Sequence, residues 1–365
     1  MKQKRLTFLL LLISNLFCAS AQKWYKPEID LKVEELLGQM TVEEKLGYIG
    51  GIDWMYTKSI DRLGIHRMRM SDGPQGIGTK GKSTAYPATV TLAATWNENL
   101  AYQYGKALGR DCRARNINVI LGPAVNIYRA PMCGRNFEYM GEDPYLTSRI
   151  CVGYIKGVQD QGVMATVKHF VANNSDYDRN NISNDIDERT LNEIYFPAYK
   201  AAIQEAEVGA IMTSYNLMNG IYTTENPWLL KEVLRNQWGF KGLVMSDWGS
   251  THYCVPAARS GLDLEMAGGE KMNPKDMAYY LKTGDVTMDM VDEKVRHILR
   301  ILIAFGFKDG TEADKSIALD DPQSVETALN VAREGLVLLK NENNILPINP
   351  KKYKHIIVTG KNAHG

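Results

Sequence analysis

Short apolar runs alternate with longer amphipathic stretches along most of the chain, and this alternation restricts the fold more than any other feature. The runs predict strands over His66–Met70, Val90–Thr95, Asn118–Leu121, Val163–Lys168, Ala210–Ser214, Leu243–Met245 and Leu262–Leu264. The clearest helical patterns cover Leu100–Arg115, Leu146–Gln161, Glu188–Glu205 and Pro227–Gln237. Repeated strand–helix units favour an α/β fold with a parallel sheet. About seven units in roughly 280 residues are typical of a TIM (β/α)₈-like barrel, and an open doubly wound sheet is the alternative.

Polar side chains stand where these apolar runs end. They are Asp72, Lys168, His169, Tyr215, Asn216, Asp247, Trp248 and Glu265. A barrel gathers the carboxyl ends of its strands at one face, where catalytic residues sit, so this pattern favours the barrel. The segment Gly242–Trp248 (GLVMSDW) is the most informative, because a carboxylate at the mouth of a buried strand is costly unless its charge is used. The alternative is that Asp247 only caps the next helix.

The N-terminus predicts a secretory signal peptide over residues 1–21. Lys2, Lys4 and Arg5 precede the apolar run Leu6–Phe17, and the small residues Ala19-Ser20-Ala21 predict cleavage after Ala21. A secreted or periplasmic location follows. The apolar run is too short for a membrane span, and a lipid-modified Cys18 is a minor alternative.

The rest of the chain divides into three expected parts. Residues 22–307 form the barrel, closed by a helix over Met288–Phe305. The polar, aperiodic residues 308–324 form a linker. Residues 325–365 contain a helical stretch (Val325–Asn341), an apolar stretch (Ile345–Ile348) and a strand-like stretch (His355–Gly360). Because a helix with one or two strands cannot bury a core of its own, this segment is expected to begin a second, truncated domain.

Charge and motifs argue against several other functions. The formal net charge of +1 does not suggest nucleic acid or a membrane surface as a partner. The six histidines are scattered along the chain, so no metal site is expected. No cofactor is expected either. Gly76–Ser83 (GIGTKGKS) matches a phosphate-binding loop, but Pro87 and the β-branched residues after it disfavour the helix that such a loop requires. Cys112, Cys133, Cys151 and Cys254 allow three complete disulfide pairings. Oligomeric state is not predicted.

Carboxylates, cations and aromatic residues are concentrated in a few stretches. Gly134–Pro144 (GRNFEYMGEDP) carries Arg135 between glycines, and Lys168–Asp178 (KHFVANNSDYD) is rich in donors and acceptors. The first stretch is interpreted as a loop that aims Arg135 at a polar ligand, and a surface loop with local ion pairs is the alternative. Aromatic faces beside charged and amide groups suit a sugar, so a carbohydrate-processing barrel is the function that the residues favour.

Several motifs together resemble glycoside hydrolase family 3. They are SDGPQG, GRNFEYMGEDP, KHFVANN, SYN, VMSDW and GLDLEM, which occur in the order of that family between about Leu31 and Phe307. The stretch EGLVLLKNENNILPI resembles the entry to the family's second, α/β-sandwich domain. The resemblance implies an exo-acting, retaining β-glycosidase, most simply a β-glucosidase that releases terminal non-reducing β-D-glucosyl residues from a β-linked oligosaccharide or β-glucoside.

The resemblance also implies roles for individual residues. Asp247 matches the nucleophile that forms a covalent glycosyl-enzyme, and cationic neighbours are expected to keep it ionised. Asp72 matches an acceptor for sugar hydroxyls, and its motif favours the β-glucosidase branch over β-xylosidases. The lack of a second histidine after His169 argues against the β-N-acetylhexosaminidase branch. The further substrate-binding matches are hydrogen-bond donors at Arg135, Lys168 and His169, and lining positions at Arg179, Met212, Tyr215 and Trp248.

The general acid/base has no match in the chain. Glucosidases of the family take this glutamate from the second domain, and Glu138, Glu142, Glu188 and Glu265 do not match an acid/base position. A non-catalytic or severely impaired sugar-binding barrel is therefore the alternative to an active β-glycosidase.

Overall fold

The computed structural model describes residues 24–78, 82–361 and 363. The predicted signal peptide, residues 1–21, lies outside the described residues, and its cleavage stays a prediction. The chain divides into two units, Met1–Gly335 and Leu336–Gly365, and each is described by itself. The first unit contains the sheet and nearly all of the helices.

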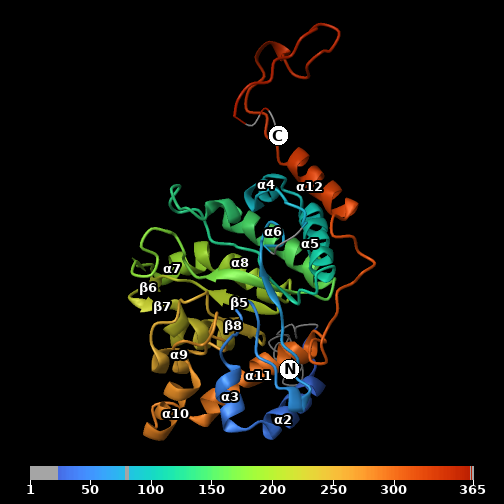
Figure 1. The fold of residues 1–365 in the computed structure, drawn as a ribbon. Coiled ribbons are helices and arrows are strands. Elements are labelled where there is room, and N and C mark those ends of the chain that lie inside the picture. Colours follow the sequence, from blue (N-terminus) through green and yellow to red (C-terminus); the bar gives the residue numbers. More distant parts are fainter. Residues whose placement is uncertain (1–23, 79–81, 362, 364–365) are drawn as a thin grey trace, which may run out of the picture. The chain divides into compact units, whose positions relative to one another are not determined.

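Five parallel strands form the centre of the first unit (Figure 1). Their order in the sheet follows their order in the chain, with Asp72 opposite Leu121 and Met212 opposite Met245. The strands are β1 (Met70–Asp72), β2 (Val119–Leu121), β3 (Met164–Phe170), β5 (Ala210–Thr213) and β8 (Leu243–Met245). Sequential parallel strands joined by helices are the arrangement of a TIM-like barrel.

Single backbone bridges connect the two edges of this sheet. They run from β8 to the segment at Leu264, then to Gly50, and through a turn back to the residue that precedes β1. The bridged pairs are Met245–Leu264, Glu265–Gly50, Ile52–Tyr56 and Tyr56–Arg69. The predicted TIM (β/α)₈-like barrel is confirmed as a TIM-like barrel, and the predicted strand at Leu262–Leu264 contributes a bridge only.

Two outer helices pack very closely. α5 (Glu98–Arg113) lies against α6 (Pro144–Gln159), as Figure 1 shows. A Cβ atom on Gly157 would lie 2.1 Å from the backbone oxygen of Tyr102, and one on Gly105 would lie 2.1 Å from that of Tyr154. Glycine at these two positions therefore sets the distance between the helices. Asn97 and Asp143 accept hydrogen bonds from the first turns of α5 and α6, which defines where the two helices begin.

The predicted strand at Val90–Thr95 is wrong, because this segment lies in α4 (Thr89–Ala94). Its buried residues are Thr89, Leu92 and Ala93, which have helical and not alternating spacing. Burial of this face outweighs the strand preference of the β-branched side chains.

The remaining helices surround the sheet or extend from it. Of those with a predicted start, α7, η5 and α11 begin within one residue of it, and the predicted helix at Glu188–Glu205 is divided into three segments. They are α2 (Pro27–Gln39), α3 (Val42–Tyr48), α7 (Glu188–Thr190), η3 (Leu191–Tyr195), α8 (Pro197–Gln204), η5 (Trp228–Gln237), α9 (Cys254–Ser260), α10 (Pro274–Thr283), α11 (Met288–Ala304) and α12 (Pro322–Glu334), with the short turns η1 (Asp61–Leu63), η2 (Asn136–Glu138) and η4 (Thr223–Glu225). A small second sheet consists of β4 (Ser183–Asn184), β6 (Leu217–Met218) and β7 (Ile221–Tyr222).

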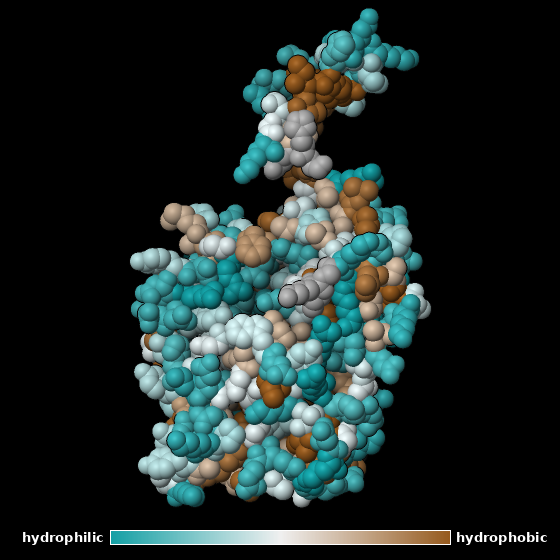
Figure 2. All heavy atoms as spheres, viewed as in Figure 1, coloured by the Kyte–Doolittle hydropathy of each residue, from teal (hydrophilic) through white to brown (hydrophobic). Residues whose placement is uncertain are grey.

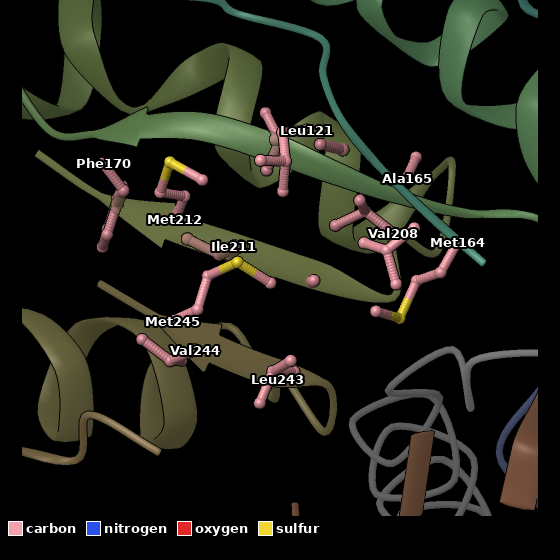
Figure 3. Packing of buried hydrophobic residues seen from close by; sticks show 14 of the residues in the cluster. Leu121, Met164, Ala165, Phe170, Val208, Ile211, Met212, Leu243, Val244 and Met245 are labelled. Carbon is pink, nitrogen blue, oxygen red and sulfur yellow. The ribbon is translucent and has the colours of Figure 1, made fainter. Parts of the chain in front are cut away.

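The core lies on and between the parallel strands. Figure 3 shows side chains of β5 between those of β3 and β8, with Ile211 and Met212 at the centre. Every residue of β2, β3, β5 and β8 is buried. Burial on both faces explains why these strands read as continuous apolar runs in the sequence.

The helix predicted at Val325–Asn341 begins and ends earlier, as α12, and belongs to the first unit. It packs on α5, where the Ser324 hydroxyl donates to Asp111 (3.0 Å) and Arg110 pairs with Asp321 (2.7 Å). The predicted linker at 308–324 and second domain at 325–365 stay predictions.

The described residues of the second unit include the 3-10 helix η6 (Glu342–Asn344) and form no strand at Ile345–Ile348 or His355–Gly360. Apolar side chains are exposed along it, including Leu339 and Ile357, and Figure 2 shows hydrophobic residues at its surface. So short a segment buries little apolar area by itself.

Three further findings concern the described residues as a whole. Their helices include none that is both long and apolar enough to cross a membrane. No group of three or more His, Cys, Asp or Glu side chains among them is arranged to hold a metal ion. The thiols of Cys112, Cys133, Cys151 and Cys254 are all free.

Candidate active site

Four of the predicted site residues meet where three strands end. Asp72 is the last residue of β1, Lys168 and His169 lie near the end of β3, and Asp247 follows β8 by two residues. The Lys168 ammonium lies 3.4 Å from Asp72 Oδ1, and His169 Nε2 lies 3.5 Å from Asp247 Oδ2. By these distances, the two neighbouring side chains Lys168 and His169 reach the same carboxylate-lined site.

Asp247 is almost fully enclosed, with 9% of its side chain exposed. The Trp248 amide donates to Oδ1 at 2.7 Å, while no described group makes a hydrogen bond to Oδ2. Oδ2 instead faces Arg135 Nη1 at 3.6 Å. The hydrogen bond from the Trp248 amide forms within the local turn. One carboxylate oxygen of Asp247, Oδ1, therefore binds the neighbouring backbone, and the other, Oδ2, faces the site.

Burial raises the pKa of Asp247, although Arg135, Lys168, the Trp248 amide and Tyr215 act in the opposite direction. The expectation that cationic neighbours keep Asp247 ionised stays a prediction. The cations offset part of the desolvation, which disfavours a charged carboxylate. Ionisation of Asp247 depends on these neighbours more than it would at an exposed position.

Arg135 is held by three different partners. Its Nε donates to Glu138, its Nη2 donates to His169 Nε2 at 2.8 Å, and its Nη1 faces Asp247. Glu138 is buried and also lies 3.8 Å from the Lys168 ammonium. Glu138 thus orients both cations, a role that the sequence reasoning missed. The spacing of three residues from Arg135 within a glycine-flanked loop is the one local signal that could have indicated it.

His169 is a hydrogen-bond acceptor at Nε2, because a guanidinium has donors only. Its Nδ1 lies 3.3 Å from Asn126 Oδ1, which places the proton on Nδ1. Burial and the cations Arg135, Lys168 and Arg179 hold the pKa of His169 well below its usual value. In this geometry the neutral ring accepts from Arg135, and the predicted role of His169 as a donor to a sugar stays a prediction.

Arg179 and Tyr215 form a stacked pair beside Asp247. The Arg179 guanidinium lies 3.9 Å from the centre of the Tyr215 ring and pairs with Asp176 at 2.8 Å. Burial and the Asp247 charge raise the pKa of the Tyr215 hydroxyl, so this group stays protonated and can donate. Met212 lies in β5 and is buried in the apolar core.

Two tryptophans lie together at the edge of the site. The Trp248 indole donates to the backbone oxygen of Trp54 at 2.8 Å, and the Trp54 side chain is 65% exposed. Phe137, from the Arg135 loop, is also exposed, and its backbone oxygen accepts from Gln75. Exposed aromatic faces next to buried charges fit a sugar ring better than an ion or a nucleotide.

The loop after Asp72 is a tight turn. The Gly78 amide donates to the Asp72 backbone oxygen at 2.9 Å, and a Cβ on Gly73 would lie 1.5 Å from Gly76 O. Residues 79–81 lie outside the described part, and residues 82–88 are not helical. The helix that a phosphate-binding loop needs does not begin at Lys82, so the glycines serve the turn that presents Asp72.

Residues 37–301 match the sequence model described as the glycosyl hydrolase family 3 N terminal domain. The chain belongs to glycosyl hydrolase family 3. Among its family 3 relatives, the beta-glucosidase of Rhizobium radiobacter is 42% identical over 337 residues, which is 91% of this chain and 41% of that protein. Thermostable beta-glucosidase B of Acetivibrio thermocellus is 39% identical over 328 residues, covering 87% of this chain and 43% of that protein.

Solved structures agree with the family 3 assignment. Beta-glucosidase 3B from Thermotoga neapolitana, in complex with alpha-D-glucose, superposes with a TM-score of 0.80 at 35% identity, over 87% of this chain and 48% of that one. The beta-glucosidase of Kluyveromyces marxianus, in complex with glucose, gives a TM-score of 0.82 at 35% identity, over 87% of this chain and 40% of that one. The chain spans less than half the length of these relatives. These relatives are glycoside hydrolases.

Proposed function

We propose that this chain is the catalytic barrel of a retaining, exo-acting β-glucosidase with Asp247 as its nucleophile. The observation that carries the proposal is the position of Asp247 at the end of β8, with Oδ2 free of hydrogen bonds and facing Arg135. A nucleophilic carboxylate needs an accessible lone pair and a neighbour that favours its ionised form. The β-glucosidase names of the family 3 relatives support the substrate class.

The proposed reaction proceeds in two displacements. Asp247 Oδ2 attacks the anomeric carbon, the bond from that carbon to the aglycone oxygen breaks, and the aglycone takes a proton from a general acid. Water then attacks the anomeric carbon of the glycosyl-Asp247 ester, gives its proton to the same group acting as base, and releases the sugar with retained configuration.

The other residues would bind the glucosyl ring. Asp72 is proposed to accept from hydroxyls remote from the scissile bond, with Lys168 and Arg135 as charged donors, which make stronger hydrogen bonds than neutral ones. His169 is proposed to act beside Asp247 through Arg135. Arg179, Met212, Tyr215 and Trp248 are proposed to line the subsite for the sugar ring or to donate hydrogen bonds to it.

The acid/base is proposed to come from outside the residues of this chain. A retaining pair needs carboxyl groups about 5–5.5 Å apart. Among the buried glutamates, Glu138 is paired with two cations, while Glu225 and Glu265 accept backbone hydrogen bonds. Each of these carboxylates already has partners in the fold. Without an acid/base, hydrolysis of natural glucosides is expected to be slower by about 10²–10⁴-fold.

The test uses 2,4-dinitrophenyl 2-deoxy-2-fluoro-β-glucoside, whose leaving group needs little protonation. The chain should accumulate one covalent fluoroglucosyl group, and peptide mass spectrometry should locate it on Asp247. Asp247→Asn should abolish labelling, whereas Asp178→Asn, an exposed carboxylate, should not change it. Sugar binding by calorimetry without any adduct would contradict the proposal and support the non-catalytic sugar-binding barrel.

A β-xylosidase is the enzymatic alternative, and the same reagent in its xylosyl form tests it. Xylose lacks the hydroxymethyl group that Asp72 is proposed to help bind. Glucosyl labelling should therefore be faster than xylosyl labelling in the wild type, and Asp72→Ala should reduce the difference. Equal rates in the wild type would contradict the glucosidase assignment.

Export is proposed from residues 1–21. The basic, apolar and small-residue segments are those of a cleavable signal. Expression in a Gram-negative host, followed by fractionation and N-terminal sequencing, should recover a periplasmic protein that begins at Gln22. A cytoplasmic protein with an intact N-terminus would refute this proposal.

A further inference from the structure

Asn126 is a buried amide that contacts His169 at three atoms. Its Nδ2 donates to the backbone oxygen of His169 at 2.9 Å, and its Oδ1 accepts from the backbone amide of His169 at 2.9 Å. The same Oδ1 lies 3.3 Å from His169 Nδ1. Asn126 follows β2, in a segment whose Val125 amide donates to Lys168 O at 2.8 Å.

The opposite edge of the imidazole ring faces a donor that cannot accept. Arg135 Nη2 lies 2.8 Å from His169 Nε2, so Nε2 must present a lone pair. A neutral histidine then carries its proton on Nδ1, where Asn126 Oδ1 is the acceptor within reach. The two neighbours therefore require the same tautomer from opposite sides of the ring.

We propose that Asn126 is a positioning residue that holds His169 as the neutral, Nδ1-protonated tautomer, so that Nε2 fixes the Arg135 guanidinium with Nη1 directed at Asp247. Glu138 holds the Nε edge of the same guanidinium, and His169 holds Nη2. With both of these positions occupied, Nη1 is the nitrogen left to face Asp247 Oδ2. The inference rests on the proposed function, because it gives Asp247 the role of nucleophile.

Protonation of His169 would break this arrangement. An imidazolium would turn an N–H toward the guanidinium and remove the acceptor of Arg135 Nη2. The charged and titratable groups that face the ring are Arg135, Lys168, Arg179, Asp247 and Tyr139. The three cations and burial disfavour the imidazolium, and the Asp247 carboxylate at 3.5 Å favours it. Neutral Asn126 adds no negative charge on the Nδ1 side, which an aspartate would do.

The first experiment reads the tautomer directly. The ¹⁵N chemical shifts of His169 in the wild-type chain, without substrate, should show a protonated Nδ1 and an unprotonated Nε2 across neutral pH. A protonated Nε2 would overturn the proposal. This measurement needs neither a variant nor catalysis, so it stands even if Asp247 is not labelled and the proposed function fails.

The second experiment replaces Asn126 by aspartate. Asn126→Asp should favour the imidazolium and move the acid limb of Asp247 labelling upward by about one pH unit or more. Asn118→Asp is the matched control, because buried Asn118 also accepts from a backbone amide and donates through Nδ2, at the other end of β2. If the two variants gave the same pH profile, a positioning role for Asn126 would be refuted.

Discussion

Removal of the Arg135 charge should make Asp247 a weaker acid. Arg135 Nη1 lies 3.6 Å from Asp247 Oδ2. At an effective dielectric constant of about 20, unit charges at this distance attract by about 4–5 kcal/mol. Solvent at the open side of the site reduces this value, and an arginine beside an aspartate usually lowers its pKa by about 1–3 units. Arg135→Met should therefore raise the already elevated pKa of Asp247 by about 1–3 units.

The sign of the pH effect follows from the need for the proposed nucleophile, Asp247, to be ionised. Labelling by the fluoroglucoside needs the carboxylate, so its rate falls as the pH decreases through the pKa of Asp247. In Arg135→Met the acid limb should therefore lie at higher pH than in the wild type. The midpoint is the quantity to measure, because the loss of a sugar contact lowers the rate at every pH.

Inactivation rates between about pH 4 and pH 9 provide the assay, with thermal unfolding as a check on the fold. Arg129→Met is the control, since Arg129 is exposed and contacts the Tyr195 ring. An unchanged midpoint in Arg135→Met would refute the reasoning, because the guanidinium would then have no effect on the ionisation of Asp247.

Three further predictions concern stability. Burial lowers the pKa of Lys294 from its usual 10.5 to about 8, so the free energy of unfolding should rise by up to about 3 kcal/mol from pH 8 to pH 10.5. Urea unfolding of Lys294→Met should lack this rise, and exposed Lys282→Met should retain it. Gly157→Ala should destabilise by about 1–3 kcal/mol in thermal unfolding, since its Cβ would meet Tyr102 O, whereas Gly38→Ala, with open space around it, should not. Ser324→Ala should lower the free energy of unfolding by about 1–3 kcal/mol and speed proteolysis at α12, because buried Asp111 loses a hydrogen-bond donor. Equal cleavage rates in the variant and the wild type would contradict this prediction.

The strands were predictable where apolar runs coincide with complete burial. β2, β3, β5 and β8 lie within one or two residues of their predicted positions for this reason. Val90–Thr95 failed because its threonines and valine favour a strand locally, while the helical face of α4 is the one that packs. Local propensity does not reveal which face of a segment will pack against the rest of the protein, because that depends on segments distant in the chain.

The site was predictable to the extent that it lies at strand ends. The meeting of Asp72, Lys168, His169 and Asp247 follows from parallel strands whose carboxyl ends share one face. The role of Asn126 was not predictable, because it acts through His169, which only the fold brings close to it. For Glu138 the sequence offered only its spacing of three residues from Arg135. The acceptor role of His169 likewise depends on Arg135, which lies 34 positions away.

The number of backbone pairs between neighbouring segments differs around the ring of strands. The strands β1, β2, β3, β5 and β8 pair along ladders, whereas single bridges join Leu264, Gly50 and the Ile52–Tyr56 turn to them. That turn carries Trp54, which accepts from the Trp248 indole. Amide hydrogens in the turn should exchange with solvent sooner than those of β5 and β8, because fewer bonds must break to open it. Trp54 thus lies in a part of the ring joined by single bridges, whereas Asp247 follows a strand that pairs along a ladder with β5. The residues that contact the Trp54 ring can therefore change over evolution with little effect on the position of Asp247, the proposed nucleophile.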